Sequence, residues 1–217
     1  KTTTGILDSK FGFSIETGDA LKAIKQSKTL ANLTFQGVHF HLGSPIFELE
    51  PYEQGIKTVL SFTSSNNIEL NEFSPGGGFA IGYVQDSLPP SVTSYAEIIT
   101  KTLSSTCSDL GIRPPKLVIE PGRSIIGRAG VAIYTVGAIK DIPSIRKYVS
   151  LDGGMGDNVR PAMYDAKYFA VIANRIVDDP EEIVSLAGKY CESGDILIKD
   201  IKLPVLETGD IIAIPAS

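Results

Sequence analysis

Residues 68–78 read IELNEFSPGGG, a short β-type run that ends in a glycine-rich loop. The same order recurs at 37–44 (GVHFHLGS) and at 116–124 (KLVIEPGRS), and a further short strand is expected at 11–14. Helical spacing of apolar residues separates these runs, which is typical of βαβ units in a parallel sheet. We therefore expect an α/β fold whose loops after the strands meet at one edge, where ligands bind.

The helices of this first part are expected at 16–28, 52–66 and 91–110. From about Gly130 the rhythm changes to β-type runs at 131–139, 147–151, 169–176, 196–201 and after Gly209, with one short helix expected at 179–186. We predict two domains: an α/β domain over 1–128 and a mostly antiparallel β domain over 129–217, incomplete at its end.

The composition excludes several classes of protein. Of the 217 residues, 42% are hydrophobic and 21% are charged, which is unlike a disordered chain or a coiled coil. The net charge of −5 argues against a nucleic-acid surface. No apolar run reaches the roughly 18 residues of a membrane span. The opening KTTTGILDSK is unlike a signal peptide, and two cysteines are typical of free thiols in a reducing compartment, so we expect a soluble, cytoplasmic chain without membrane or nucleic-acid partners.

Both histidines of the chain lie in one tripeptide, His39-Phe40-His41, at the end of the second predicted strand. Residues i and i+2 of a strand point to the same face, so the pair could bind a metal. No cysteine or carboxylate stands at ligand spacing nearby, and no metal is expected. The two rings could fill a barrel interior, but we favour one of them stacking on a flat cofactor, with the Ser44 hydroxyl donating to a phosphate.

Two further motifs follow strands. Gly76, Gly77 and Gly78 allow the backbone to approach an anion closely and to point N–H groups at it, although a plain tight turn is an equally simple interpretation. In the motif Glu120-Pro121-Gly122-Arg123, a carboxylate and a guanidinium are held apart by a rigid turn. One could bind a protonated ring nitrogen and the other a phosphate or a carboxylate, or the two could form a surface ion pair.

The second part of the chain carries two more candidate motifs. Residues 152–164 read DGGMGDNVRPAMY, in which Arg160 and Tyr164 have the pattern of a carboxylate clamp. Residues 191–195 read CESGD, which places the Cys191 thiol beside the Glu192 carboxylate in a glycine-containing loop. A lone cysteine is more often buried, but with an acid and a turn beside it a proton-donor role is credible.

In this order, HFHLGS, GGGF, EPGRS, DGGMGDNVRPAMY and CESGD closely resemble the alanine-racemase-like (fold type III) decarboxylases that depend on pyridoxal 5′-phosphate. The resemblance implies the C-terminal half of a (β/α)8 TIM-like barrel that binds this cofactor, over residues 1–128, followed by the β domain. A closed barrel needs eight βα units and roughly 250 residues, about twice what this part offers.

The resemblance also implies roles for single residues. His41 would stack on the pyridine ring, and Ser44 and the glycine triplet would hold the phosphate. The motif of Glu120, Pro121, Gly122 and Arg123 would also bind the cofactor, and Glu120 would keep the pyridinium nitrogen protonated, so that the ring accepts electrons when CO₂ leaves. Substrate carboxylate would be bound by Arg123, Arg160 and Tyr164. Cys191 would return a proton, and Glu192 would bind the distal ammonium group. The cysteine loop would reach into the partner subunit's site, so a homodimer is expected.

The implied reaction is decarboxylation of meso-2,6-diaminopimelate to L-lysine and CO₂, the last step of lysine biosynthesis. Alternatives are a related decarboxylase of the carboxynorspermidine, ornithine or arginine type, and a non-catalytic, decarboxylase-like binding subunit. The family's Schiff-base lysine lies N-terminal to the HxH motif, and a cofactor-contacting tyrosine lies beyond the last residue of this chain. We therefore expect the chain to be an internal fragment that is inactive alone.

Overall fold

The computed structural model describes residues 9–84, 88–175 and 179–217. Its contacts divide the chain into two compact units. Unit 1 comprises Lys1–Ala80 and Pro89–Ile125, and unit 2 comprises Ile81–Leu88 and Ile126–Ser217. The expected boundary between residues 128 and 129 lies close to this division, but unit 2 also takes up the segment from Ile81 to Leu88. The division into domains stays a prediction.

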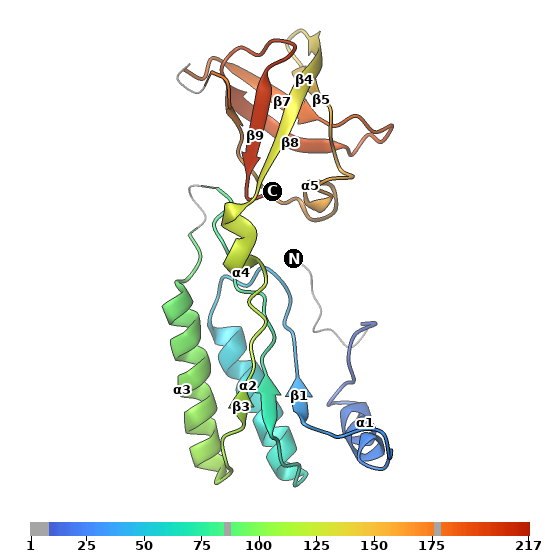
Figure 1. The fold of residues 1–217 in the computed structure, drawn as a ribbon, viewed down its shortest axis with the longest axis vertical. Coiled ribbons are helices and arrows are strands. Elements are labelled where there is room, and N and C mark those ends of the chain that lie inside the picture. Colours follow the sequence, from blue (N-terminus) through green and yellow to red (C-terminus); the bar gives the residue numbers. More distant parts are fainter. Residues whose placement is uncertain (1–8, 85–87, 176–178) are drawn as a thin grey trace. The chain divides into compact units, whose positions relative to one another are not determined.

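Unit 1 contains a parallel sheet of three strands in the order β1-β2-β3 (Figure 1). The strands are β1 (Gly37–His39), β2 (Glu72–Ser74) and β3 (Lys116–Leu117), and they alternate with α2 (Glu50–Ser65) and α3 (Val92–Leu110), while α1 (Asp19–Ser27) precedes β1. Val38 pairs with Phe73, and Phe73 with Leu117. The expected βα architecture of half a TIM-type barrel is confirmed.

The helices form where the sequence places their signals. In α3, Ser91 is the N-cap and its side chain accepts a hydrogen bond from the Ser94 amide, and Gly111 ends the helix in the left-handed conformation with φ of 65°. In α2, the side chains of Tyr52, Ile56 and Leu60 are buried at a spacing of four residues, which is one face of a helix. This face packs against α3 and the sheet in the core of unit 1.

The strand expected at 11–14 is wrong: this segment consists of bends and unpaired backbone. Gly12 has φ of 66°, outside the extended region, and Phe11 and Phe13 are 60% and 71% exposed. A short apolar run forms a strand only where a neighbouring strand satisfies its backbone, and no described strand pairs with this one.

Unit 2 contains a six-stranded sheet in the order β6-β9-β4-β5-β7-β8. Its strands are β4 (Val131–Ile142), β5 (Arg146–Leu151), β6 (Val171–Ile172), β7 (Glu182–Ala187), β8 (Ile196–Leu203) and β9 (Ile211–Pro215). All neighbours are antiparallel except β5 and β7. Every strand contributes to the core, which includes Tyr134, Val136, Val149, Leu151, Ile172, Val184, Leu186, Leu197, Ile212 and Ile214. The mostly antiparallel β part is confirmed.

The helix expected at 179–186 is also wrong, because most of this segment is the strand β7. Partners on both sides, β5 and β8, satisfy its backbone, and this tertiary pairing overrides a weak helical pattern. Conversely, the sequence analysis missed the short helices α4 (Arg123–Ile126) and α5 (Arg160–Tyr164) and the 3₁₀ turn at Gly127–Ala129. The strand expected at 169–176 is shorter, and its residue 176 lies outside the described residues.

Across the described ranges, none of the helices combines the length and the hydropathy required to cross a bilayer.

The strand assignment of β7 predicts that two substitutions in this one element change stability by very different amounts. Leu186 is fully buried at 0% exposure whereas Ile183 is 63% exposed, although residues three apart would share one face of a helix. We expect Leu186→Ala to lower the free energy of unfolding by about 2–5 kcal/mol, because it leaves a cavity in the core of unit 2. Ile183→Ala is the matched control and should change it by less than about 0.5 kcal/mol. Urea denaturation measures both, and equal losses would contradict the strand.

Candidate functional site

The carboxyl ends of the three parallel strands of unit 1 bring three sequence motifs together. His39 is the last residue of β1 and His41 follows it, the segment after β2 carries the glycine triplet, and Glu120 follows β3. Gly77 forms an isolated parallel bridge with Glu120, and the Glu120 amide donates to the Gly76 carbonyl at 3.0 Å. The predicted clustering at this edge is therefore realised by backbone pairing that continues beyond the strands.

The glycine triplet occupies space that no side chain could share. A Cβ on Gly77 would lie 1.9 Å from the Glu120 carbonyl oxygen, and a Cβ on Gly76 would lie 2.5 Å from the Phe40 carbonyl oxygen. Gly76 and Gly78 also have φ of 74° and 92°, which side chains other than hydrogen strongly disfavour. All three positions thus require glycine because the neighbouring backbone of unit 1 lies too close for a Cβ.

The amides of this loop are partly engaged inside unit 1. The Gly76 N–H donates to the Ser74 hydroxyl at 3.1 Å, and the Gly77 N–H donates to Nδ1 of His41 at 3.3 Å. Because Nδ1 of His41 accepts this hydrogen bond, the neutral ring carries its proton on Nε2. The loop therefore orients the His41 imidazole through the backbone.

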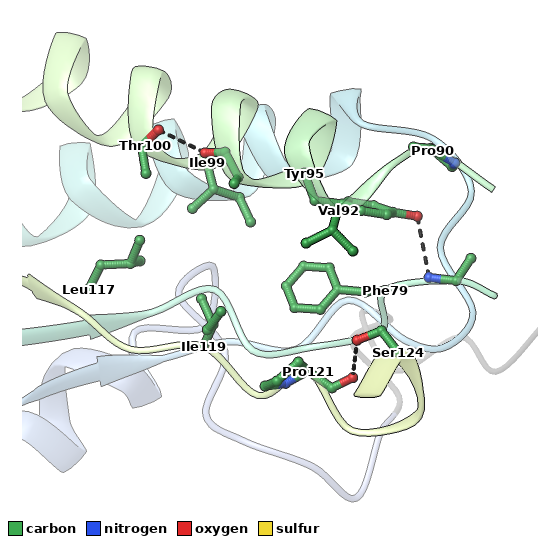
Figure 2. A pocket seen from close by; sticks show the side chains of 12 residues that line it. Phe79, Pro90, Val92, Tyr95, Ile99, Thr100, Leu117, Ile119, Pro121 and Ser124 are labelled. Atoms are coloured by element: carbon green, nitrogen blue, oxygen red, sulfur yellow. Dashed lines mark hydrogen bonds between the residues drawn. The ribbon is translucent and has the colours of Figure 1, made fainter. Parts of the chain in front are cut away.

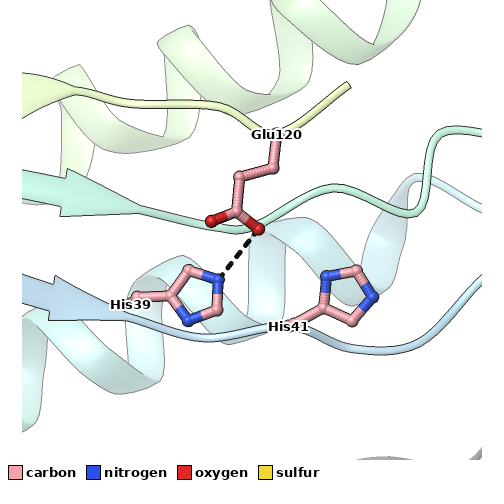
Figure 3. Close-up of side chains that lie close together, drawn as sticks. All are labelled: His39, His41 and Glu120. Atoms are coloured by element: carbon pink, nitrogen blue, oxygen red, sulfur yellow. Dashed lines mark hydrogen bonds and ion pairs between the residues drawn. The ribbon is translucent and has the colours of Figure 1, made fainter. Parts of the chain in front are cut away.

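Glu120 lies beside the histidine pair. Its carboxylate Oε2 is 3.2 Å from Nε2 of His39, and the two side chains are 55% and 48% exposed (Figure 3). This contact joins residues that are 81 positions apart. A carboxylate with this much exposure is accessible to a further cationic or N–H partner at the strand ends.

The same three side chains form a group that could hold a metal, since one ligand atom from each of His39, His41 and Glu120 lies within 4.8 Å of the others. The sequence analysis found no carboxylate near the histidines because this one comes from another strand. Glu120 already pairs with His39, however, and Nδ1 of His41 accepts from Gly77. We assign no metal to this group.

The remaining candidates of unit 1 flank the cluster. Ser44 is half-buried in the segment that follows His41. Two residues further on, the Ile46 amide donates to the Gly78 carbonyl at 2.8 Å. Pro121 and Gly122 form the turn that leads from Glu120 into α4, and Arg123 is the first residue of that helix. The Ser124 hydroxyl and amide both bond to the Pro121 carbonyl, which fixes the turn.

In unit 2, Arg160 is held between two tyrosines. Its Nη1 donates to the Tyr168 hydroxyl at 2.6 Å, and its guanidinium carbon lies 4.7 Å from the centre of the Tyr83 ring. The two rings meet edge to face at 5.4 Å. Tyr164, at the other end of α5, is 45% exposed. The clamp residues therefore belong to one helix, with the Arg160 guanidinium fixed by aromatic neighbours.

Cys191 and Glu192 are exposed on a loop between β7 and β8 of unit 2. Oε1 of Glu192 accepts from the Ser193 hydroxyl at 3.3 Å and from the Gly194 amide at 3.4 Å. The other cysteine, Cys107, is fully buried in α3, and burial raises the pKa of its thiol. Of the two thiols, only Cys191 is accessible to a reactant.

Four residues at these sites escaped the sequence analysis: Tyr52, Tyr83, Tyr168 and Asp195. The Tyr52 hydroxyl donates to the Gly77 carbonyl at 2.7 Å, and Asp195 accepts backbone hydrogen bonds from two loops. The contacts of Tyr52 with Gly77 and of Asp195 with Met155 join residues far apart in the sequence, so no local pattern indicates them. The contact of Asp195 with Tyr190 lies within one loop. Only Asp195 carried a signal, as the last residue of the CESGD motif.

A cavity of about 300 Å³ lies in unit 1 between α3 and the segment from β3 to α4 (Figure 2). Phe79, Tyr95, Ile99, Leu117 and Ile119 point into it, and among the described residues that line it none is charged. Its one phenol, that of Tyr95, has a pKa raised by burial, so the lining suits apolar matter better than proton transfer. We therefore place the candidate chemistry at the strand ends and not in this cavity.

Comparison with protein families gives a match that spans the whole of unit 1. The family model described as pyridoxal-dependent decarboxylase, pyridoxal binding domain, matches residues 1–127.

Relatives and solved structures match nearly the whole chain. It is 47% identical over 212 residues to a diaminopimelate decarboxylase of Staphylococcus aureus strain COL, covering 97% of this chain and 50% of the relative. The corresponding values for a diaminopimelate decarboxylase of Bacillus subtilis strain 168 are 44% over 216 residues, 98% and 49%. A crystal structure of diaminopimelate decarboxylase from M. jannaschii with L-lysine superposes with a TM-score of 0.88 at 35% identity, covering 98% of this chain and 49% of that one. The chain thus spans about half the length of the curated relatives it matches.

The buried hydrogen bond from the Tyr52 hydroxyl to the Gly77 carbonyl predicts the effect of Tyr52→Phe. Tyr52 is 0% exposed, so its loss leaves the Gly77 carbonyl without this donor, and we expect the free energy of unfolding at pH 7 to fall by about 1–3 kcal/mol. Burial raises the pKa of Tyr52, so the folded protein keeps the phenol protonated while the unfolded chain ionises above pH about 10. The stability that Tyr52 contributes is therefore complete below that pH and is lost as the pH rises.

Chemical denaturation of both proteins between pH 7 and pH 11 tests this expectation. The advantage of the unsubstituted protein should shrink by about 1.4 kcal/mol per pH unit above pH 10. Tyr164→Phe serves as the control, because Tyr164 is 45% exposed and should show neither effect. A stability difference between the unsubstituted protein and the Tyr52→Phe variant that stays constant with pH would contradict the burial of this phenol.

Proposed function

The chain belongs to the pyridoxal-dependent decarboxylase family, and we propose that the protein containing it decarboxylates meso-2,6-diaminopimelate to L-lysine and CO₂ with pyridoxal 5′-phosphate. One observation carries the proposal: His41, the glycine triplet and Glu120 meet at the carboxyl edge of the parallel sheet. The identity to diaminopimelate decarboxylases over both units supports the substrate, and so does the relative whose structure contains L-lysine.

The residues at the strand ends fit this cofactor. A phosphate needs backbone that can come close, and the glycine triplet places three consecutive residues without a Cβ at the strand ends. A flat ring needs a flat partner, and the backbone holds the His41 imidazole in one orientation. A pyridinium nitrogen needs a carboxylate, and Glu120 provides one that is half exposed. The donor set therefore matches phosphate, ring and nitrogen in turn.

When bound, the cofactor supplies a conjugated ring that takes up the electron pair released when CO₂ leaves the substrate. Glu120 would hold the proton on the ring nitrogen, and its contact with His39 keeps the carboxylate at the strand ends. His41 would stack on the ring, while Ser44 and the loop from Gly76 to Gly78 would bind the phosphate. These groups orient and stabilise, and none of them needs to move during the reaction.

The groups of unit 2, together with Arg123, would handle the substrate. Arg160, with Tyr164 and Arg123, would bind substrate carboxylate, and its contacts with Tyr83 and Tyr168 limit the directions that its remaining N–H groups can take. The Glu192 carboxylate would bind the distal ammonium group. The Cys191 thiol would deliver its Sγ proton to the substrate carbon that has lost CO₂.

We also propose that the active protein is a homodimer in which the cysteine loop of one subunit completes the site of its partner. The exposure of Cys191 and Glu192 on the surface of unit 2 supports this arrangement, since a loop that serves a partner's site must be accessible to it.

The test is the release of CO₂ by the complete protein, purified with pyridoxal phosphate, from meso-2,6-diaminopimelate, carboxynorspermidine, L-ornithine and L-arginine. We expect CO₂ from diaminopimelate with L-lysine as the product. CO₂ from one of the other substrates but not from diaminopimelate would assign a related decarboxylase. Binding of the cofactor without any CO₂ would favour the non-catalytic binding subunit.

The role of Glu120 predicts a separation of turnover from cofactor binding. We expect Glu120→Gln to lower kcat about 10²-fold or more, because the amide no longer holds the proton on the ring nitrogen. Cofactor affinity should change far less, since the glycine loop and His41 are untouched. Glu72→Gln is the control: Glu72 lies on the same sheet and pairs with Lys116 at 2.9 Å, at the amino ends of β2 and β3. An unchanged kcat in Glu120→Gln would refute the assignment.

A further inference from the structure

Asp195 is the buried centre of the two functional loops of unit 2. Asp195 is 3% exposed, and its two carboxylate oxygens accept hydrogen bonds from two different loops. Oδ1 accepts from the Met155 amide at 2.6 Å, in the glycine-rich loop 152–157. Oδ2 accepts from the Tyr190 amide at 2.9 Å, in the cysteine loop 188–195. One side chain therefore connects the loop that leads to Arg160 with the loop that carries Cys191.

The Asp195 carboxylate lies so close to Gly154 and Gly188 that neither position has space for a side chain. A Cβ on Gly188 would lie 2.1 Å from its Oδ2, and a Cβ on Gly154 would lie 2.6 Å from the same atom. No Lys or Arg among the described residues forms an ion pair with Asp195. Burying a carboxylate without a cation costs free energy unless hydrogen bonds replace those to water. The hydrogen bonds from the two amides therefore stabilise the buried Asp195 carboxylate.

The cysteine loop itself closes on Asp195. The Gly188 amide donates to the Asp195 carbonyl at 2.8 Å, and the Asp195 amide donates to the Glu192 carbonyl at 3.0 Å. The Glu192 amide in turn donates to the Tyr190 carbonyl at 2.8 Å. Cys191 lies within this closed turn, so its position is determined by the Tyr190 amide on one side and by Glu192 on the other.

We propose that Asp195 is a positioning residue that fixes the cysteine loop against the glycine-rich loop and thereby places the Cys191 thiol for proton delivery. The proposal rests on the proposed function in so far as Cys191 is the proton donor. Asp195 acts through Cys191 and does not itself touch the substrate.

The geometry distinguishes Asp195 from an ordinary polar residue. Each carboxylate oxygen serves one N–H group, whereas an asparagine has one oxygen and one NH₂ group, and the NH₂ group would face an N–H donor. Asp195→Asn therefore breaks one of the two connections while preserving size and shape. Asp152 is a matched control, because its Oδ1 accepts from the Thr135 amide at 2.8 Å and an asparagine oxygen can take over that bond.

The first experiment is a double-mutant cycle in the complete protein with pyridoxal phosphate bound. We expect Asp195→Asn to lower kcat for diaminopimelate about 10²-fold with cofactor occupancy unchanged, because a small displacement of a reacting group is enough for such a loss. In a Cys191→Ala background the same substitution should lower kcat by less than about threefold, since the group that it positions is gone. Asp152→Asn should leave kcat unchanged in both backgrounds.

Equal losses in the two backgrounds, or an unchanged kcat in Asp195→Asn, would overturn the positioning role. If the unsubstituted protein releases no CO₂ from any of the substrates, the proposed function fails, and the second experiment still decides whether Asp195 connects the loops.

The second experiment measures amide hydrogen exchange and needs no turnover, and its first measurement uses the unsubstituted protein alone. In the unsubstituted protein, the amides of Met155 and Tyr190 should exchange at least about 10²-fold more slowly than in an unstructured peptide. Asp195→Asn should speed the exchange of one or both of these amides and leave that of Thr135 unchanged. Unprotected Met155 and Tyr190 amides in the unsubstituted protein would overturn the connection itself.

Discussion

The close contact between the backbones of Gly77 and Glu120 is the constraint on which the candidate site depends. The Glu120 carbonyl comes so near Gly77 that a Cβ there would lie 1.9 Å away. This contact extends the pairing of β2 with β3 past the ends of the strands, and the Gly77 amide orients His41 in the same place. Because Tyr52 holds the Gly77 carbonyl from the core of unit 1, the packing of α2 and the geometry of the strand ends are linked.

In unit 2, glycines also make room for a close polar contact, but the contact there is with the Asp195 side chain and not with the backbone of a neighbouring strand. The Asp195 carboxylate accepts two backbone amides where Gly154 and Gly188 leave no room for a Cβ. In both units, glycine admits a polar group that then orients a candidate functional side chain. Gly77, Gly154 and Gly188 are thus explained by what must fit beside them, and conformational freedom matters where φ is positive, as at Gly76.

The sequence predicted the parts of this molecule that local rules determine. The helices α2 and α3 and the runs that became β1, β2 and β3 follow from the periodicity of apolar residues. The contact of His39 with Glu120 spans 81 residues, and its register depends on two strand pairings that no local pattern encodes. The two wrong elements, 11–14 and 179–186, are short segments in which the presence or absence of neighbouring strands decided the outcome.

The two units carry different parts of the functional argument. The family model ends at residue 127, so membership of the family rests on the residues that would hold the cofactor. Such residues serve any amino acid that reacts on this cofactor, because the ring, its nitrogen and its phosphate are the same in every case. The proposed choice of diaminopimelate would therefore depend on Arg160, Cys191 and Glu192, all of which lie beyond the residues that the family model matches. A carboxylate that is exposed on a loop selects a substrate only if the loop is held in one place, and in this chain the buried Asp195 provides that hold.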